Sequence, residues 1–477
     1  MGETGVWVAN AIDGTISRLD LSTARVVDTI VVEGRPTGVA VGTGGVWVIP
    51  DVRVPPADAA SDGVTFGLIA DCRGGFSSSR DIQFAGAQLP LIQRGAERVG
   101  DPADGVVNAT VAGRPVEIVT ACTDGTSWSY LNEARWLVED RSADVVIGTH
   151  PPGVQIALRD YARRQPGVTF MATQGGLQSA TLRNPAPNFF RFFTDASQWP
   201  AGLGSYAYHD LGWRRAAVVD GNWGLLFGEA AGFIAEFCSL GGQIVHRTSM
   251  PVFGPPIYDE QIAAFPTSGI DGVFLASHFA PLEALMETHP FFADNVADRV
   301  IGGSITFDAE VTKYEELIDQ LESVAYAEPG HDAEPSGEAL ERFVADFDAA
   351  FPDHAGNAPF NPTMGYYNNM EAALRALEFV DGDLSDGQRR FQEALAAVEF
   401  EAPNGHARLD GNRQVVSRAF LSKLGRDDDG LPMARTFRRI DNVEQTYNGY
   451  FTPDSPEPGR NSPACVAGNP PPWALAP

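Results

Sequence analysis

The chain has 477 residues, enough for about two to four domains, and its apolar content of 44% is ordinary for a globular protein. With 34 Lys and Arg against 62 Asp and Glu, the net charge of -28 argues against nucleic-acid binding and against adsorption to anionic lipid. No stretch reaches the roughly 18 consecutive apolar residues of a membrane helix, so we expect no insertion into a membrane. The N-terminus also shows no export signal, which fits either an intracellular protein or part of a longer exported chain.

The first fifty residues differ in pattern from the rest of the chain. The sequence GVWV begins at Gly5 and again at Gly45, and two alternating runs, DGTISRLDL and RVVDTIVV, lie between the two copies. Alternation with period two predicts β-strands, and a repeat of about 40 residues fits one four-stranded propeller blade. Residues 1–50 resemble the YVTN/NHL-like propeller repeats, and residues 51–61 are typical of a linker.

From Val64 onward, short apolar runs alternate with helical patterns. Two consecutive series of this kind predict an α/β fold with two Rossmann-like parallel-sheet lobes joined by a hinge, preceded by a short all-β segment. The expected strands of the first series are 64–70, 115–120, 144–148 and 168–171, and those of the second are 215–220, 242–247, 271–276 and 299–304. Helices are expected again at 337–351, 368–380 and 385–398, followed by a strand pair at 405–410 and 414–421.

These patterns give a division into domains in which the chain passes between the lobes more than once. Lobe 1 is expected to hold residues 62–191 and 309–400, and lobe 2 residues 192–308 and 401–453. The Pro-rich tail, residues 454–477, is expected to lie on the surface.

The four cysteines have no metal-type spacing but allow two disulfides. Cys72 and Cys122 end consecutive predicted strands, and neighbouring parallel strands bring their carboxyl ends together. Cys238 lies on a predicted helix and Cys465 in the tail, so a second bridge would pin the tail. The alternative is four unrelated buried thiols, but the even count favours an oxidising, extracytoplasmic compartment.

The sequence lacks the common patterns of enzyme sites. It contains no GxxxxGK[ST] loop, no HExxH pair, no GxSxG elbow and no GxGxxG fingerprint, and its eight histidines are scattered. We therefore expect no catalytic residue, no cofactor and no metal ion.

Ligands of open α/β sheets bind beyond the carboxyl ends of the strands, and two lobes that face each other make a cleft that closes by a hinge. The loops after the predicted strands combine small residues, hydroxyls and aromatic rings, as small-molecule sites do. The alternatives are structural packing for Trp223, packing between the lobes for Phe279 and a solvated loop position for His150. For Arg73 the alternative is a surface ion pair, and for Ser79 it is capping of the helix near Asp81. The candidate ligand-binding residues are Arg73, Phe76, Ser79, His150, Gly153, Gln174, Gly175, Gly176, Trp223, His278, Phe279 and Ser304.

Residues 62 to about 425 resemble the type I periplasmic solute-binding proteins, in particular the branched-chain amino acid (Leu/Ile/Val) family of ABC importers. The resemblance rests on the order of the segments GLIADCRGGFSSSRDIQFAGAQLPL, NFFRFFTDASQWPAGLGSYAYHDLGWRRAAVVDGNWG, IDGVFLASHFAP, MGYYNNMEAALRAL and FEAPNGHARLDGNRQ. It implies a monomeric protein outside the cytoplasm that closes on a small molecule and delivers it to an ABC permease. Trp223 stands where that family usually has a tyrosine that covers the ligand.

Departures from the family pattern bear on specificity. Family members that hold an α-amino acid have a serine-bearing loop after the third strand and an Ala-Thr pair after the fourth, whereas this chain has HPPGV and TQGGL at these places. In addition, no carboxylate directly follows the strand that ends near Ile301. These departures disfavour a simple α-amino acid, and Phe76, Trp223 and Phe279 favour a flat or aromatic solute, with Arg73 or His150 available to an acid group. The expected ligand is thus amino acid-like, an amide or an aromatic acid. The alternative function is a ligand-sensing receptor domain with a signalling partner, which the N-terminal repeat favours.

Overall fold

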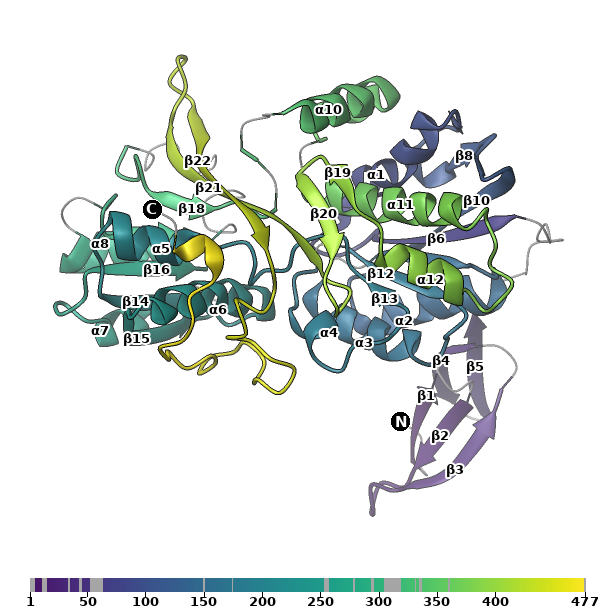
Figure 1. Cartoon of the computed structure of the whole chain (residues 1–477). Helices are drawn as coiled ribbons and strands as arrows, with labels where there is room; N and C mark the ends of the chain where they lie inside the picture. The colour runs from purple at the N-terminus through teal and green to yellow at the C-terminus, as the bar shows by residue number, and fades with distance from the viewer. Residues whose placement is uncertain are drawn as a thin grey trace.

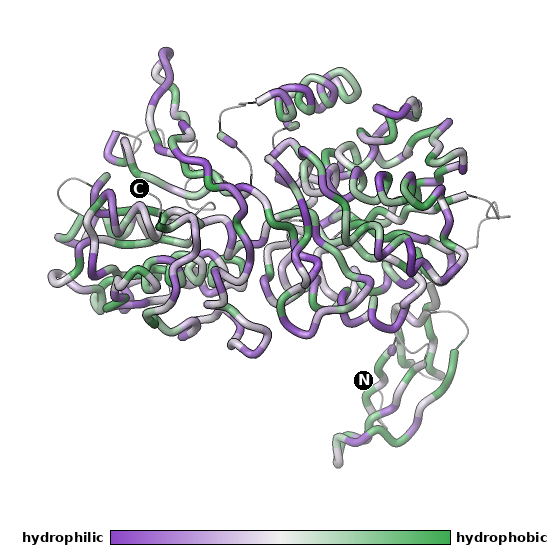
Figure 2. The backbone as a smooth tube through the Cα atoms, in the orientation of Figure 1, coloured by the Kyte–Doolittle hydropathy of each residue, from purple (hydrophilic) through white to green (hydrophobic). Residues whose placement is uncertain are grey.

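The computed structural model describes residues 5–10, 15–32, 35–42, 45–51, 63–148, 151–173, 175–252, 257–277, 279–292, 296–303, 319–330, 332–333, 337–358 and 361–475. Two α/β lobes lie next to each other, and an all-β segment projects from the first (Figure 1). The predicted α/β fold with parallel sheets is confirmed. Apolar residues lie along the strands of both lobes and along those of the N-terminal segment (Figure 2).

The sheet of lobe 1 has the order β13-β12-β11-β6-β10-β9, and its strands are parallel except β9. Its strands are β6 (Val64–Asp71), β9 (Thr110–Val111), β10 (Arg114–Thr123), β11 (Val145–Gly148), β12 (Thr169–Ala172) and β13 (Phe189–Phe190). The β6 strand is buried on both faces, as parallel strands between two helix layers are. Phe66 and Leu68 join the core beneath α1 (Arg80–Gln93), α11 (Asn361–Phe379) and α12 (Arg389–Ala396), whereas Ile69 joins the core with α2 (Ser127–Arg135) and α3 (Pro152–Ala162).

The sheet of lobe 2 begins with four parallel strands in the order β15-β14-β16-β17. These are β14 (Arg215–Gly221), β15 (Gln243–Met250), β16 (Gly272–Ala276) and β17 (Val300–Gly302). The apolar helix α6 (Gly224–Ser239) is buried along nearly its whole length against this sheet, where Phe233 stacks on Phe274 at 4.4 Å between ring centroids. The other helices of this lobe are α5 (Leu203–Ser205), α7 (Asp259–Ala264) and α8 (Phe279–Thr288).

One expected lobe boundary differs from the strand pairing. The sequence pattern predicts that residues 309–400 belong to lobe 1, but β18 (Ala325–Ala327) pairs with β17 and with β21 (Val415–Arg426) in the sheet of lobe 2. The three buried residues of β18 are too few to form a recognisable pattern. The antiparallel partner β22 (Pro432–Val443) was also not expected, and β19 (Phe400–Ala402) and β20 (Gly405–Leu409) continue the sheet toward lobe 1.

The remaining elements are short, apart from α10 (Glu338–Ala350), which lies over α1 (Figure 1). Helix α1 ends at Gln93, and Gly95 beyond it adopts a positive φ of +99° that does not continue a helix. The short elements are α4 (Ser179–Leu182), β7 (Glu97–Arg98), β8 (Val106–Val107), 3-10 turns at Ser77–Ser79, Pro102–Asp104, Pro290–Phe292, Pro352–His354 and Pro472–Ala474, and π turns at Trp136–Asp140 and Tyr206–Asp210.

The N-terminal segment is all β, as predicted. A three-stranded antiparallel sheet, β1-β2-β3, is followed by an antiparallel hairpin, β4-β5. These strands are β1 (Val6–Asn10), β2 (Thr15–Leu19), β3 (Val26–Val31), β4 (Arg35–Gly42) and β5 (Gly45–Asp51). The segment leaves several large apolar side chains exposed, including Val31, Trp47 and Ile49.

A fully buried ion pair lies where the chain passes from lobe 1 to lobe 2. The guanidinium of Arg191 lies 3.4 Å from the carboxylate of Asp195 and donates hydrogen bonds to Gln414 and Gln155. The backbone of Arg191 also bridges to that of Gln414, so two connections between the lobes lie against each other here. Burial raises the pKa of Asp195 to about 6 and lowers the pKa of Arg191 to about 10, because loss of solvation outweighs their mutual attraction.

Both predicted disulfides are present. The Cys72–Cys122 bond links the carboxyl ends of the adjacent parallel strands β6 and β10, with Cα atoms 5.3 Å apart. The Cys238–Cys465 bond links α6 to the C-terminal tail. The tail therefore lies on the protein as expected, held at one point by a covalent bond.

Candidate functional site

Two predicted aromatic residues meet across the lobes. Phe76 lies in the turn after β6 of lobe 1, and Trp223 directly precedes α6 of lobe 2. Their ring centroids are 6.4 Å apart and the ring planes differ by 15°, which is an offset stacked arrangement. The two loops that the sequence pattern placed at strand ends are thus brought together in the space between the lobes.

Local backbone geometry sets the position of Trp223. Its extended backbone makes it the residue that caps α6, and its carbonyl accepts the hydrogen bond from Phe227 N at 3.0 Å. The preceding Gly221 lies so close to Leu226 and Val252 that a Cβ there would fall within 2.6 Å of both. The glycine allows the strand to turn sharply into the helix, so the ring of Trp223 faces the other lobe.

Gly175 and Gly176, which follow β12, allow close approach on the lobe 1 side. Gly176 has a positive φ of +73°, and a Cβ on it would lie 3.2 Å from Leu225 of lobe 2. A Cβ on Gly175 would lie 2.5 Å from the amide of Gln155. Side chains at these positions would therefore press on the contact between lobes or on the core of lobe 1.

A pocket of about 280 Å³ lies beside the stacked rings and is formed by both lobes and the C-terminal tail. This volume is close to the lower end of the range of small-molecule sites, about 300–1,000 Å³. The first turns of α3 and α6 both border the pocket. In α3, Pro152 has no N–H and Val154 N donates to the carbonyl of Pro151, so Gly153 is the first-turn residue that offers an amide, whereas α6 begins with Gly224, whose amide has no partner within the helix. Such amides favour a carboxylate. The pocket is lined by Pro152, Gly153, Leu177, Gln178, Ser179, Trp223, Gly224, Gly228, Glu457 and Pro458.

The acidic residues at the ends of β6 and β14 have structural roles. Asp71 accepts a hydrogen bond from Thr123 at 2.5 Å, and Asp220 pairs with Arg247 at 2.8 Å. Burial raises the pKa of both carboxyl groups. These carboxylates hold neighbouring strands together and lie within the protein, so they are poorly placed to contact a solute.

The other candidate residues divide into three groups. The hydroxyl of Ser79 donates to the carbonyl of Phe76 and accepts from Gln83, both at 2.8 Å, so it supports the turn. The side chain of Arg73 is exposed, and Phe279 is the first residue of α8. His150, Gln174, His278 and Ser304 lie outside the described residues.

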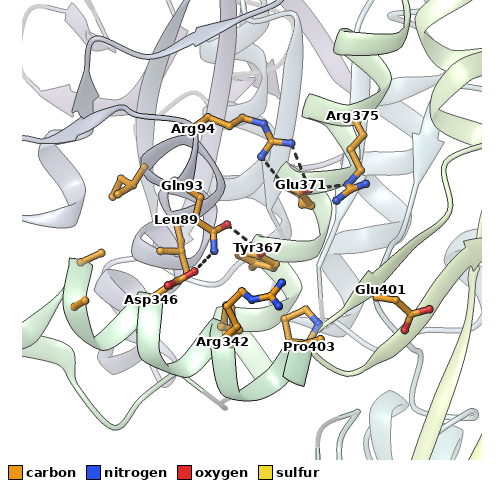
Figure 3. Close-up of a pocket in the computed structure, with 15 residues that line it drawn as sticks. Leu89, Gln93, Arg94, Arg342, Asp346, Tyr367, Glu371, Arg375, Glu401 and Pro403 are labelled. Atoms are coloured by element: carbon orange, nitrogen blue, oxygen red, sulfur yellow. Dashed lines mark hydrogen bonds and ion pairs between the residues drawn. The ribbon is translucent and has the colours of Figure 1, made fainter. Parts of the chain in front are cut away.

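A larger hollow, of about 710 Å³, lies on lobe 1 among α1, α10 and α11 (Figure 3). Its polar side chains bind one another: Arg94 and Arg375 both pair with Glu371 at 2.6 Å, and Gln93 donates to Asp346 at 2.7 Å. Most of its lining comes from α1, α10 and α11, with Glu401 and Pro403 at one edge, and neither of the stacked rings lines it.

The sequence pattern missed part of the interlobe pocket. Leu177 and Gln178 directly follow the predicted Gly175 and Gly176. The TQGGL loop therefore indicates this part of the pocket, but the prediction ends one or two residues before it. Glu457 and Pro458 belong to the tail, which has no periodic pattern. In the sequence, the predicted Cys238–Cys465 bond is the feature that places the tail near α6, and α6 borders the pocket.

The sequence profile of a family described as periplasmic binding protein matches residues 63–429. The chain belongs to the periplasmic binding protein family. This is a family of extracytoplasmic solute-binding proteins rather than enzymes. No curated protein matches the sequence significantly. Among the helices that the structure describes, none has the length and apolar character needed to span a bilayer.

Solved structures of this family share the fold. An ABC transporter substrate-binding protein from Sphaerobacter thermophilus is 22% identical, with a TM-score of 0.67 over 80% of this chain and 99% of that one. A solute-binding protein of an ABC transporter from Rhodopseudomonas palustris, in complex with 3,4-dihydroxybenzoic acid, is 20% identical, with a TM-score of 0.61 over 81% and 99%. A leucine-binding protein from Thermotoga maritima is 17% identical, with a TM-score of 0.60 over 79% and 99%.

Proposed function

We propose that this periplasmic binding protein closes its lobes on an aromatic carboxylate and delivers it to an ABC importer. The observation that carries the proposal is the stacking of Phe76 on Trp223 across the lobes, beside a pocket that both lobes line. A flat solute next to these rings gains stacking energy, and its carboxylate would lie against the first turns of α3 and α6.

The choice of an aromatic acid over an aliphatic amino acid has two supports. The loops after β11 and β12 lack the serine and Ala-Thr pattern that the branched-chain family uses for an α-amino acid. The similar protein from Rhodopseudomonas palustris has 3,4-dihydroxybenzoic acid bound, although the Thermotoga maritima protein is named for leucine. An amino acid-like molecule or an amide is the next class to test.

Arg73 and His150 are proposed to pair with the acid group, and Gln174, His278, Phe279 and Ser304 to line the rest of the site. The protein is proposed to act as a monomer, without catalytic activity, and to dock on its permease when its lobes are closed. A sensing role with a signalling partner is the second candidate. It is favoured by the all-β N-terminal segment, a three-stranded sheet and a separate hairpin, which has no evident use in transport.

A thermal-shift screen tests the proposal. The protein is unfolded, refolded and offered benzoate, 4-hydroxybenzoate, aliphatic amino acids, aromatic amides, sugars and nucleosides. A ligand at about 100 times its dissociation constant adds about 2.7 kcal/mol to the free energy of unfolding. Shifts with aromatic acids are expected. Shifts confined to aliphatic amino acids would overturn the choice of ligand class.

A further inference from the structure

The C-terminal tail passes over the place where the two lobes meet. It leaves β22 of lobe 2, and its first part is anchored by Tyr447 and Phe451, which are both buried. The tail then loops toward lobe 1, where it contacts Arg183, and returns to α6 of lobe 2 (Figure 1). Two of its residues, Glu457 and Pro458, line the interlobe pocket beside Trp223.

A single arginine of lobe 1 holds the tail on one side of the pocket. Arg183 donates hydrogen bonds to the carbonyls of Ser455 at 2.7 Å and Pro456 at 2.9 Å. Its other terminal nitrogen donates to Gln178 and Ser179, which themselves line the pocket. The donors of Arg183 are therefore directed at the tail backbone and at α4, and they fix the residue that follows, Glu457.

Lobe 2 holds the tail on the other side. The side chain of Arg247 donates to the carbonyl of Ser462 at 3.1 Å, and the backbones of Gly459 and Ser462 exchange two hydrogen bonds of 3.0 Å in a closed turn. Three residues further on, Cys465 is covalently bound to Cys238 of α6. Glu457 thus lies between two anchors, and its position does not depend on the loop alone.

Glu457 is exposed at the edge of the pocket. Its carboxylate forms no salt bridge within the described part of the chain, and the nearby guanidinium of Arg183 donates to two tail carbonyls and to Gln178 and Ser179. Burial lowers the pKa of Arg183, and the charge of Glu457 acts against that change, so the two groups are close enough to interact. Among the residues that line this pocket, Glu457 is the one with an ionisable side chain.

We propose that the tail is the third wall of the solute site and that Glu457 determines specificity by favouring a solute whose far end is cationic or neutral. The inference rests on the proposed function, because the carboxylate of the solute is assigned to the first turns of α3 and α6. A solute with acid groups at both ends would bring its second charge toward Glu457. At separations of about 6–8 Å near a protein surface, one charge changes affinity by about five- to tenfold.

Three para-substituted benzoates test this role with the intact chain. They are 4-(aminomethyl)benzoate, 4-(hydroxymethyl)benzoate and terephthalate, which share the ring and one carboxylate and differ only in the charge of the other end. Dissociation constants are measured by calorimetry for the wild type, for Glu457→Gln and for Asp454→Asn. Asp454 is an exposed acid of the same tail outside the pocket lining, so its variant carries the same change in net charge.

The wild type is expected to bind the three probes in the order cationic, neutral, anionic. The first and the last probe differ by two charges at this end, so in Glu457→Gln the ratio of their dissociation constants should shrink about 25- to 100-fold, and in Asp454→Asn it should stay within about twofold. The double variant Cys238→Ala with Cys465→Ala removes the covalent anchor of the tail but keeps the hydrogen bonds from Arg183 and Arg247, so it should lose part of the same discrimination. An unchanged ratio in Glu457→Gln overturns the role of the tail but leaves the proposed function intact. Failure of all three probes to bind the wild type counts against the proposed function itself.

Discussion

The ring of Phe76 in lobe 1 stacks on the ring of Trp223 in lobe 2, with the two planes 15° from parallel. Each ring belongs to a loop at the carboxyl end of a parallel strand, and the two strands lie in different sheets. The distance between the two rings is therefore a measure of how closely the two lobes approach each other. A planar solute beside the rings would be held by the same surfaces that hold the lobes together.

Replacing Trp223 should weaken solute binding. Trp223→Ala removes the lobe 2 ring and is expected to raise the dissociation constant of an aromatic acid about tenfold or more, since stacked aromatic pairs contribute about 0.5–1.5 kcal/mol beyond the buried area. Trp223→Phe should recover part of the affinity. Calorimetry with a probe found in the thermal-shift screen measures both. Trp128→Ala is the control, because Trp128 lies on α2 and is 46% exposed. Equal losses in the two alanine variants would contradict a role for Trp223.

A methyl group at Gly176 should obstruct the approach of the lobes. Gly176→Ala places a Cβ 3.2 Å from Leu225 and 3.4 Å from Ala196, whereas Gly95→Ala places one in open space at a similarly positive φ. Both variants should lose about 1–2 kcal/mol of unfolding free energy from backbone strain. Only Gly176→Ala should also weaken solute binding, by about tenfold, which corresponds to 1.4 kcal/mol. Denaturant titration and calorimetry separate the two effects, and unchanged affinity in Gly176→Ala would mean that the contact does not limit closure.

The buried Arg191–Asp195 pair should make stability depend on pH. The pKa of Asp195 is about 6 in the folded protein against an ordinary value of 3.8, so the folded state binds this proton more tightly. The stabilisation from this tighter proton binding is fully present below about pH 4 and is lost as the pH rises through 6. Its upper limit is about 3 kcal/mol of unfolding free energy. Asp195→Asn cannot titrate, so it lacks this proton-linked stabilisation. The free energy of unfolding of the wild type relative to the variant should therefore be higher at pH 4.5 than at pH 7.5.

Urea titrations of the wild type and of Asp195→Asn at these two pH values give the difference directly. General acid effects on stability cancel, because they act on both proteins. Asp454→Asn, an exposed acid, should track the wild type at both values. A destabilisation by Asp195→Asn that does not change with pH would show that Asp195 stays ionised throughout.

Loss of either disulfide should lower stability by different amounts. The Cys72–Cys122 bond joins residues 50 apart in sequence, and the Cys238–Cys465 bond joins residues 227 apart. Removing a disulfide costs about 2–5 kcal/mol, and the chain-entropy model assigns the larger value to the larger loop. Thermal unfolding of the two paired Cys→Ala variants measures this order. A variant with all four alanines should be insensitive to reductant, which controls for the reagent.

The fold followed from the sequence because its signals are local and repeated. Apolar runs that end in glycine turns identified the strands β6, β10, β11 and β12 of lobe 1 and their counterparts in lobe 2. The exceptions lack such signals. Strand β18 is three residues long, and β22 alternates between intermediate and exposed positions, so its charged side chains conceal the strand.

The residues of the candidate site could be proposed from the sequence only where they follow the rule of strand ends. Phe76, Gly176 and Trp223 each come directly after a strand or its turn, and the structure brings them to the gap between the lobes. Ser79 was a plausible candidate by the same rule, but its hydroxyl is bonded to Phe76 and Gln83. Glu457 could not be found from its neighbours in sequence, because its position is set by Arg183 and by a bond to Cys238, both far away along the chain.

The bond between Cys238 and Cys465 also makes a covalent ring of the chain between these residues, which includes β15 to β22 and the return through lobe 1. A single peptide-bond cut within that ring, for example in the exposed hairpin between β21 and β22, would leave one connected molecule while the disulfide is intact. A protein built this way would survive nicking by extracellular proteases with both lobes still joined, and its cleaved form would separate only under reducing conditions.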